Sequence, residues 1–535
     1  MSEEAKRIVI VGAGMAGLTA AAYALRDGYD VLLLEKNDRW GGLLNTFESN
    51  GFSFDAGPRA FVNSGIVQPI FKDLGIEGEF LENKITIGIE DQLMRVDSID
   101  ATRNYQRILE HLYPESKADI ENIIASIDRL SYYTSVLYEF DNPNFTDLMG
   151  DPKYIFRKLI PWTFKFLNAL RKFNRYDMPM EDYLKSLTDN QSLTDIILQH
   201  FFRQTPTYFA LGYFYVYLDY FYPKGGTVVL ADLLKDRIVD QGGEMKLNTE
   251  IVKVHPAEAT ITDSNGESYS YDHLIWTADL KTLYRSLDPS GLEPRVAEQI
   301  EAETRRMLSA KGAESVFILF LGVDRPLSYF QQRGGEHMFY TPSREGLGET
   351  NREARTRLVN NVGALSEDDL WTWVNDYVSL NTYEVSIPAL RDPALAPEGQ
   401  TGVMISCLLD YDIVAKIEEA GLYAEFKNSL EKRIIQVFSR SIYKDLAKDL
   451  LFTFSSTPFT IEQVSGSSEG AITGWSFETD VPVVDRLKDI PKSVNTPIPG
   501  VLQAGQWSYS PAGVPIAMLT GWYAAQDIKK RTKPV

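Results

Sequence analysis

The fold is decided by a stretch near the N-terminus that reads Arg7-Ile-Val-Ile-Val11, then Gly12-Ala-Gly14-Met15-Ala16-Gly17, then Leu18 to Asp27, then Asp30-Val-Leu-Leu-Leu-Glu35. This order predicts a strand, a glycine turn, a helix and a second strand, which together form a βαβ unit. Both strands are continuous apolar runs, as expected for a parallel sheet that helices cover on both faces. The stretch therefore predicts an α/β protein with a Rossmann-type domain.

The glycine turn indicates what this domain binds. In Gly12-x-Gly14-x-x-Gly17 the first glycine permits a tight turn, the second lets a pyrophosphate approach the backbone, and the third lets helix and strand pack closely. The phosphates would lie at the positive end of the helix. Glu35 at the end of the second strand would accept hydrogen bonds from the adenosine ribose and repel a 2′-phosphate, so NADP is disfavoured.

The composition excludes several classes of protein. A chain of 535 residues with 44% hydrophobic and 24% charged residues is a folded protein of more than one domain. Its net charge of -20 argues against nucleic acid as the main partner. The single Cys407 excludes an intrachain disulfide and a cysteine-rich metal cluster, and it fits a reducing, cytoplasmic compartment. The five histidines are scattered along the sequence, so we expect no metal site.

Two uncharged runs could be mistaken for membrane spans. The first, Ile8 to Leu25, contains the glycine motif and is explained by it. The second, Gln204 to Leu218, is rich in tyrosine and falls short of the ~20 apolar residues that a spanning helix needs. We therefore expect no transmembrane helix.

Three separated segments share the α/β character of the N-terminus, and we expect them to form one domain: 1–100, 222–290 and 485–535. The middle segment contains strand patterns near Glu244 to Leu247, Ile251 to His255 and Leu274 to Ala278. The last segment contains an apolar run at Val501 to Ala504 and a helical tail from Val514. Residues 101–221 and 291–484 carry most of the aromatic and helical patterns, and we expect them to form an interleaved α+β substrate domain.

The residues after Glu35 carry a resemblance to a known family. A second glycine pair in Arg39-Trp40-Gly41-Gly42 is followed by the turn Phe52-Ser-Phe54-Asp55-Ala-Gly57-Pro58-Arg59. The combination resembles the superfamily of flavin-containing amine oxidases and phytoene desaturases, with the strongest likeness to carotenoid desaturases and prolycopene-type isomerases. Tyr222-Pro-Lys-Gly-Gly226 and Gly500-Val-Leu-Gln-Ala-Gly505-Gln-Trp507 are similar to later segments of that superfamily.

The resemblance implies that the dinucleotide is FAD, and no histidine or cysteine pattern suggests a covalent link, so we expect noncovalent FAD. Many relatives have arginine directly after the second glycine pair, where this chain has Leu43, so Arg39 or Arg59 is expected to reach the pyrophosphate instead. Val252 is expected to lie against the adenine. The expected FAD contacts are Gly12, Gly14, Met15, Ala16, Gly17, Glu35, Lys36, Arg39, Gly41, Gly42, Leu43, Gly57, Pro58, Arg59, Val252, Gly505, Gln506, Gly513, Val514 and Pro515.

The expected substrate region is dense in aromatic residues between Phe201 and Tyr222. Aromatic faces provide a large apolar area at low entropic cost, so these residues could line a tunnel for a long apolar substrate; alternatively they are core residues of the second domain. Both interpretations stay open on the sequence alone. The substrate candidates are Phe201, Phe202, Tyr208, Phe209, Tyr213, Tyr217 and Trp507.

Residues 151–176 carry seven basic side chains against one acid inside an acidic chain. The apolar residues that recur at helical spacing are Ile155, Leu159, Trp162, Phe166, Leu170 and Phe173, and Pro161 suggests a helix start. Such a segment could lie in the membrane interface as a basic amphipathic helix, or it could be a surface helix whose apolar stripe faces the core. The first interpretation predicts a cytoplasmic protein with peripheral membrane contact.

The candidates for catalytic roles are Arg59, Asp219, Trp507 and Tyr509, each of which could equally be structural. The resemblance implies hydride transfer from a carbon-carbon bond of an isoprenoid polyene to the flavin. A redox-neutral cis-trans isomerase, an amine or protoporphyrinogen oxidase, and a protein that retains FAD without catalysis are the alternatives. The sequence has no second Gly-x-Gly-x-x-Gly for NAD(P)H, so the expected electron acceptor is oxygen or a quinone.

Overall fold

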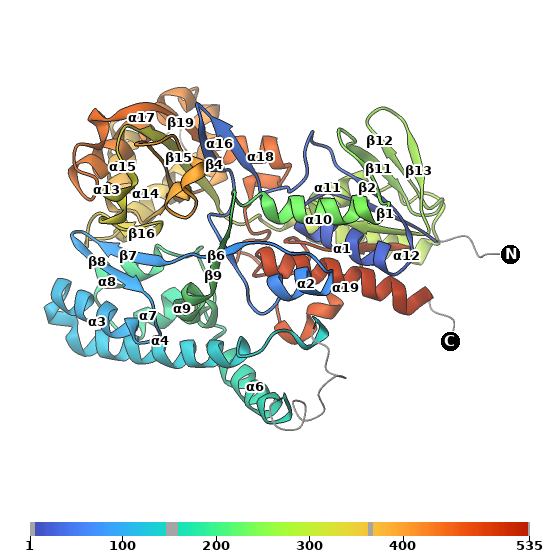
Figure 1. The fold of residues 1–535 in the computed structure, drawn as a ribbon, viewed down its shortest axis with the longest axis horizontal. Helices are drawn as coiled ribbons and strands as arrows, with labels where there is room; N and C mark the ends of the chain where they lie inside the picture. The colour runs from blue at the N-terminus through green and yellow to red at the C-terminus, as the bar shows by residue number, and fades with distance from the viewer. Residues whose placement is uncertain (1–5, 146–158, 362–366, 533–535) are drawn as a thin grey trace.

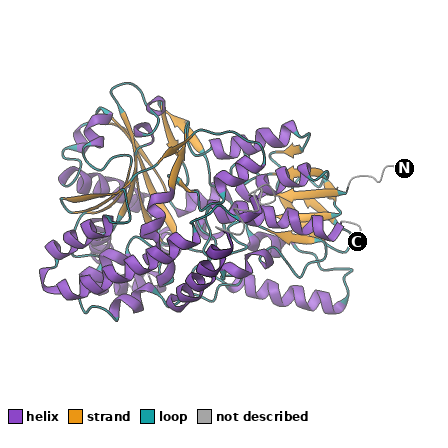
Figure 2. Cartoon of the chain, turned by 60° about the horizontal axis from the view of Figure 1, so that its bottom comes forward, coloured by secondary structure: helices purple, strands orange, loops and turns teal. Residues whose placement is uncertain are grey.

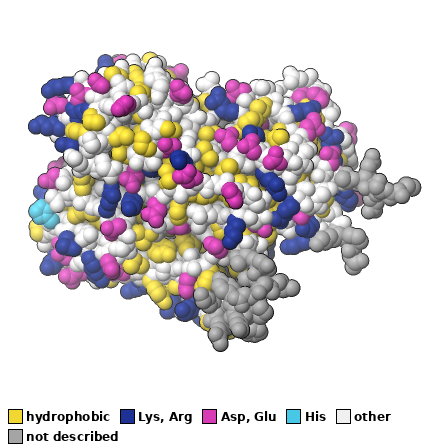
Figure 3. Space-filling model, viewed as in Figure 1, with side chains coloured by type: hydrophobic (Ala, Val, Ile, Leu, Met, Phe, Trp, Pro, Cys, Tyr) yellow, Lys and Arg dark blue, Asp and Glu magenta, His cyan; other side chains and the backbone are white. Residues whose placement is uncertain are grey.

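The computed structural model describes residues 6–145, 159–361 and 367–532. The molecule is elongated, with one large β-sheet in each half (Figures 1 and 2). Both chain ends lie at the half that contains β1 and α19 (Figure 1). On the face drawn in Figure 3, basic and acidic side chains are interspersed.

The first sheet has five parallel strands in the order β10-β2-β1-β14-β20. Its strands come from the three separated segments: β1 Arg7–Val11, β2 Asp30–Leu34, β10 Glu244–Lys246, β14 His273–Trp276 and β20 Val501–Gln503. The prediction of an α/β fold of the Rossmann type is confirmed.

Both faces of this sheet are buried, which explains the continuous apolar runs. Ile8 and Ile10 point to the face covered by α1 (Met15–Arg26), α10 (Val229–Asp240) and α19 (Val514–Thr532). Val9 and Val11 point to the opposite face. That face is covered by α11 (Leu280–Ser286), α12 (Pro294–Ser309) and a small sheet of β11 (Ile251–His255), β12 (Thr260–Asp263) and β13 (Ser268–Ser270).

The second sheet has seven strands in the order β19-β15-β18-β17-β16-β7-β8. All its pairs are antiparallel except that of β16 with β7. Its strands are β19 Leu450–Ser456, β15 Ser315–Val323, β18 Thr401–Leu409, β17 Tyr383–Ser386, β16 His337–Thr341, β7 Ile85–Ile89 and β8 Gln92–Val96. β7 and β8 belong to this sheet although they fall within the segment 1–100 expected for the flavin domain.

The two faces of the second sheet differ. Met338, Val385 and Cys407 point into a core formed with α14 (Gly348–Asn361), α15 (Glu367–Leu380), α16 (Tyr411–Glu419) and α17 (Tyr423–Arg440). Cys407 is buried there, on β18. On the opposite face, Phe320 packs with phenylalanines of the hairpin β3–β4 (Thr46–Ser49 and Phe52–Asp55). Strand alternation places His337, Phe339 and Glu384 on that same face.

Helices pack against the end of the second sheet that is formed by β7 and β8. They are α3 Ala101–Leu112, α4 Lys117–Leu137, α6 Ile160–Phe173, α7 Met180–Lys185, α8 Gln191–Leu198 and α9 Thr207–Val216. α4 packs against both α6 and α9. After α9 the chain forms β9 (Tyr220–Pro223), which pairs with β5 (Phe61–Val62) and β6 (Phe80–Glu82). Within the described residues, the helices are all too short or too polar to cross a bilayer.

Candidate functional site

The glycine turn between β1 and α1 has room only for glycine at two positions. Gly12 has φ +101°, and a Cβ atom there would lie 2.9 Å from the amide nitrogen of Ala278. A Cβ at Gly17 would lie 1.9 Å from the carbonyl oxygen of Gly12, because the helix packs directly on the turn. The strand, turn and helix are therefore held at a spacing that any side chain would break.

Gly14 is different, because a Cβ atom there would have no atom of the protein within 4 Å. Gly14 is the N-cap of α1, and neither a side-chain cap nor an acidic residue occupies the first helical turn. The open space thus faces the positive end of α1, with its backbone N–H groups unclaimed by side chains. This cradle fits the pyrophosphate of a dinucleotide, and Met15 and Ala16 form the first turn of the helix behind it.

The second glycine pair lies against the first. The amide of Gly41 donates to the carbonyl of Ala13 at 2.8 Å, and a Cβ at Gly42 would lie 3.3 Å from the Cα atom of Gly14. Gly42 thereby extends the same cradle. Residues 28 positions apart in sequence thus form one surface made of backbone.

Glu35 is buried at the end of β2. Its Oε2 atom accepts the Ala13 amide at 2.8 Å, and its Oε1 atom accepts the Asn37 amide at 3.0 Å. Burial raises the pKa of the Glu35 carboxyl above its ordinary value, although these hydrogen bonds oppose the shift. The carboxyl group is fixed beside the glycine turn, where the sequence predicts recognition of the ribose.

Asp55 joins two motifs that the sequence identified separately. Its buried carboxylate accepts hydrogen bonds from Thr46 Oγ1 at 2.7 Å, Tyr222 at 2.9 Å and the Thr227 amide at 2.9 Å. The turn after Asp55 is equally tight, because a Cβ at Gly57 would lie 1.8 Å from the carbonyl oxygen of Leu43.

The side chains of Arg59 and Arg39 contact residues near them in the sequence. Arg59 is buried; its Nη1 atom donates to the carbonyl oxygens of Asp55 at 2.7 Å and Gly57 at 2.6 Å, and its Nε atom has no partner. Arg39 is exposed and pairs with Asp38 at 2.9 Å. Their roles toward a pyrophosphate stay predictions.

The C-terminal segment packs on the first turn of α1. A Cβ at Gly505 would lie 3.4 Å from the Cβ of Ala16, and one at Gly521 would lie 2.3 Å from the carbonyl oxygen of Ala16. The Gly505 amide donates to Thr520 Oγ1 at 2.9 Å. The segment 505–515 therefore lies beside the cradle, with Val514 and Pro515 opening α19 just after Gly513.

The other residues named from the sequence lie in different surroundings. Trp507 is buried, with its ring 4.7 Å from that of Trp475, and the Tyr509 hydroxyl donates to the Asp485 carbonyl at 3.2 Å. Val252 is exposed on β11, and the Gln506 amide reaches Ser467 Oγ at 3.5 Å. The Lys36 amine lies against Gly466. No contact described here tests their assignment to FAD or substrate.

Four of the aromatic candidates form one connected group. The Tyr213 ring lies 5.8 Å from Phe201, 5.4 Å from Phe209 and 5.3 Å from Tyr217. Tyr208 instead contacts Phe173 of α6 at 4.6 Å. The Phe202 carbonyl accepts the Thr205 hydroxyl at 2.6 Å.

The aromatic group continues onto the second sheet through residues that the sequence analysis did not single out. Phe339 of β16 lies 5.5 Å from both Tyr217 and His337, and Tyr220 lies 5.9 Å from His337. Behind them, His337 is hydrogen-bonded to Asn83 and to Glu384, each at 2.9 Å. The signal that could have found them is a charged residue alternating with aromatic and aliphatic ones in Tyr383-Glu384-Val385.

Asp219 follows α9 and holds the turn at Ser64, whose amide donates to Asp219 Oδ2 at 2.6 Å. Burial raises the pKa of Asp219 to about 6, with the Ser64 hydrogen bond opposing the shift and the charge of Asp141 adding to it. Asp219 thus ties the helical block to the segment after β5.

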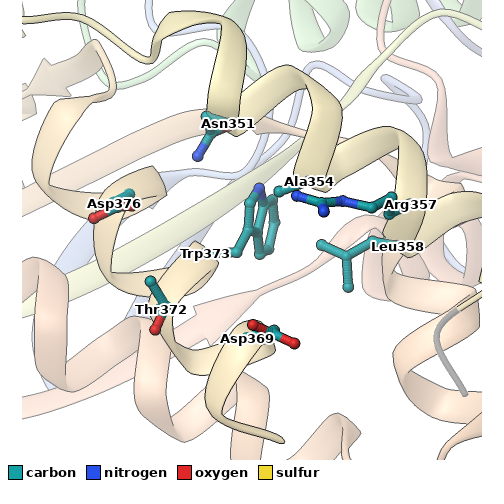
Figure 4. Close-up of a pocket in the computed structure, with 8 residues that line it drawn as sticks. All are labelled: Asn351, Ala354, Arg357, Leu358, Asp369, Thr372, Trp373 and Asp376. Carbon is teal, nitrogen blue, oxygen red and sulfur yellow. The ribbon is translucent and has the colours of Figure 1, made fainter. Parts of the chain in front are cut away.

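A cavity of about 200 Å³ lies on the other side of the second sheet, between α14 and α15 (Figure 4). Trp373 stands at its centre, and Asn351 points toward the indole (Figure 4). Trp373 belongs to the helix-covered core, so this cavity is separated by the sheet from Glu384. Across the described ranges, no group of three or more His, Cys, Asp or Glu side chains is placed to hold a metal ion.

The glycine cradle, the buried Glu35 and the parallel sheet define a dinucleotide-binding protein of the Rossmann class. The family model described as flavin containing amine oxidoreductase matches residues 15–529. The chain belongs to this family and is an FAD-dependent oxidoreductase, as the glycine motifs predicted.

Two relatives and one solved structure illustrate the likeness. The chain is 24% identical over 510 residues to 4,4'-diapolycopene oxygenase of Methylomonas sp, covering 91% of this chain and 90% of the relative. It is 22% identical over an alignment of 551 residues to 4,4'-diapophytoene desaturase (4,4'-diaponeurosporene-forming) of Staphylococcus aureus (strain MRSA252), covering 98% and 99%. A putrescine oxidase triple mutant superposes with a TM-score of 0.60 at 13% identity, covering 98% and 99%. The resemblance stated from the motifs is thereby confirmed.

Proposed function

We propose that this protein forms carbon-carbon double bonds in a long apolar polyene. The observation that carries the proposal is the connected aromatic group of Phe201, Phe209, Tyr213, Tyr217 and Phe339, which packs along the helical block of the substrate half and would offer an extended apolar wall to a polyene. The names of the two curated relatives refer to polyenes, which supports the same substrate class. Bound FAD supplies a two-electron oxidant.

The half that contains the glycine turn would bind the cofactor, and the half that contains the aromatic group would bind the substrate. The cradle at Gly14 and Gly42 would hold the pyrophosphate, and Glu35 would hold the ribose. The aromatic side chains would bind the polyene and exclude water. Oxygen or a quinone would reoxidise the reduced flavin.

The test is an anaerobic incubation of the purified, flavin-loaded protein with phytoene and with diapophytoene, while the flavin absorbance is followed. Bleaching together with a more conjugated product is the expected result. A changed cis-trans isomer with no net flavin reduction would instead establish the redox-neutral isomerase. If only an amine or a porphyrinogen bleaches the flavin, that compound and not a polyene is the substrate. If none of these compounds bleaches the flavin, the proposal is overturned.

We further propose that the flavin is held without a covalent bond. The single thiol, that of Cys407, lies in the core on the helix-covered face of the second sheet, away from the cradle. Precipitating the protein with acid should therefore release all the flavin into the supernatant. Yellow colour that stays with the pellet would contradict this.

Membrane contact through α6 is the last part of the proposal. Trp162 and Phe173 of the expected apolar stripe are buried against the protein, so that stripe faces the core. A second stripe is exposed: Ile160 at 41%, Phe164 at 71% and Leu167 at 56%. The basic Lys165 and Arg171 are exposed on the same helix. Residues 151–158 of the basic segment, with Lys153, Ile155, Arg157 and Lys158, lie outside the described residues.

A further inference from the structure

We infer that Glu384 is the base that removes a proton from the substrate, and that Arg391, Asn83 and His337 hold it in its ionised form. The inference rests on the proposed desaturation and adds to it the residue that accepts the proton. It starts from a chain of hydrogen bonds on the face of the second sheet that carries His337, Phe339 and Glu384, which we call the inner face.

The direction of this chain follows from its first member. Arg391 can only donate, and its Nη1 atom lies 2.7 Å from Asn83 Oδ1. Asn83 therefore presents its amide Nδ2 to His337 Nδ1, at 2.9 Å, and the ring nitrogen must accept. With Nδ1 unprotonated, neutral His337 carries its proton on Nε2 and donates it to Glu384 Oε1, at 2.9 Å.

The surroundings favour a neutral histidine and a charged glutamate. Burial lowers the pKa of His337, and the charges of Arg391 and Arg59 add to this, while Glu384 opposes it. For Glu384, burial would raise the pKa, but the hydrogen bond from His337, the charge of Arg59 and the Ser406 hydroxyl hold it below its ordinary value. Tyr213, Tyr217 and Tyr220 face the same region from the helical block.

The Glu384 carboxylate is partly accessible. The His337 side chain is 1% exposed, whereas that of Glu384 is 33% exposed although β17 is the middle strand of seven. Only one close hydrogen bond binds the carboxylate, since Ser406 Oγ lies 3.3 Å from Oε2. Glu384 is also the direct cross-strand neighbour of Phe339, which belongs to the aromatic group. An ionised carboxylate therefore opens onto the proposed polyene wall.

The chemistry balances with one base. A C–H bond of the substrate breaks, its proton goes to a Glu384 oxygen, and its electron pair becomes the second bond between the two carbons. The neighbouring carbon loses a hydride to the bound flavin, which is the two-electron oxidant. The proton then leaves Glu384 for water, and the carboxylate is restored. A positioned base of this kind contributes about 10²-fold to 10⁴-fold.

The decisive variant is Glu384→Gln, which keeps the size of the side chain and accepts from His337 but cannot take a proton. We expect unchanged flavin content and unchanged polyene binding, with the rate of flavin reduction by the polyene lowered about 100-fold or more. Glu384→Asp, which retains a carboxylate, should keep part of the rate. Glu48→Gln, at an exposed position of β3, is the matched control and should stay within about twofold.

A second measurement does not depend on activity. The ¹⁵N spectrum of histidine-labelled, flavin-loaded protein, with His337 assigned by its loss in His337→Asn, should show Nδ1 unprotonated and Nε2 protonated at neutral pH. A proton on Nδ1 would reverse the chain and overturn the inference. So would wild-type rates in Glu384→Gln while the wild type oxidises a polyene. If the wild type oxidises no polyene, the proposed function itself fails, and the role of Glu384 falls with it.

Discussion

The two halves of this molecule build their candidate sites in different ways, one from backbone and the other from side chains. Around the glycine turn the site is made of backbone: Gly12, Gly14 and Gly42 bring amides and empty space together, with Glu35 as the one functional side chain. Across the molecule, the inner face of the second sheet is made of side chains, with Glu384, His337 and Phe339 supplied by two strands. A backbone site is altered by adding a single carbon, whereas a side-chain site can change its chemistry and keep its fold.

The largest expected effect is on the backbone site. Gly14→Val places a side chain in the space where a pyrophosphate would lie, and its Cβ atom would have no protein atom within 4 Å, so the apoprotein should keep its unfolding temperature. FAD binding should weaken at least about 100-fold, which is about 2.7 kcal/mol. Flavin titration followed by absorbance or fluorescence measures this.

Its matched control is Gly17→Ala, three residues away. The smaller methyl group would lie 1.9 Å from the Gly12 carbonyl oxygen, so this variant should lose about 3 kcal/mol of folding free energy in urea unfolding. Stoichiometric flavin in folded Gly14→Val would contradict the assignment of the cradle. A stable Gly17→Ala would show that the turn is less constrained than its geometry indicates.

The second prediction concerns a side chain that joins the two halves. Because the pKa of Asp219 is raised to about 6, the folded state binds its proton more tightly than the unfolded state does, whose value is near 4. Stability should therefore fall as the pH rises from about 4 to about 6. Asp219→Asn keeps an acceptor for the Ser64 amide and removes the titration.

The variant should accordingly match the wild type at pH 4 and exceed it at pH 7, by about 2 kcal/mol. Urea unfolding at the two pH values measures the difference. Equal stability of the two proteins at both pH values would show that burial does not disfavour the Asp219 charge. The ionisation of Asp219 would then make no contribution to the pH dependence of stability.

The same contrast explains what the sequence could and could not predict. Backbone sites follow from glycine spacing within a strand-turn-helix pattern, so Gly12, Gly14, Gly17 and Glu35 could be placed together from local sequence alone. The chain from Arg391 through Asn83 and His337 to Glu384 joins residues up to 308 positions apart. The alternation in Tyr383-Glu384-Val385 could mark Glu384 alone, but no local pattern shows that the four side chains meet, because strand pairing between distant segments decides this.

The aromatic residues show the same limit on a smaller scale. Their density between Phe201 and Tyr222 is visible in the sequence, but it does not tell which of them share a surface. Tyr213 and Tyr217 join the group that reaches Phe339, whereas Tyr208 packs on α6. In α6 the sequence identified an apolar stripe, and tertiary packing placed that stripe against the protein, leaving another one exposed.

That exposed stripe gives the last prediction, which extends the comparison to the surface of the substrate half. Phe164 and Leu167 are one turn apart on α6, and exposing both to water leaves their apolar area free to enter a lipid interface. Phe164→Asp with Leu167→Asp should weaken binding to vesicles of mixed phosphatidylcholine and phosphatidylglycerol about tenfold, because apolar burial is lost and charge repulsion is added. Val464→Asp, on an exposed site of α18 (Pro458–Ser465), is the control and should bind as the wild type does. If Val464→Asp loses vesicle binding to the same extent, the loss is caused by added negative charge and not by α6. If the wild type never sediments with vesicles, α6 is not a membrane contact.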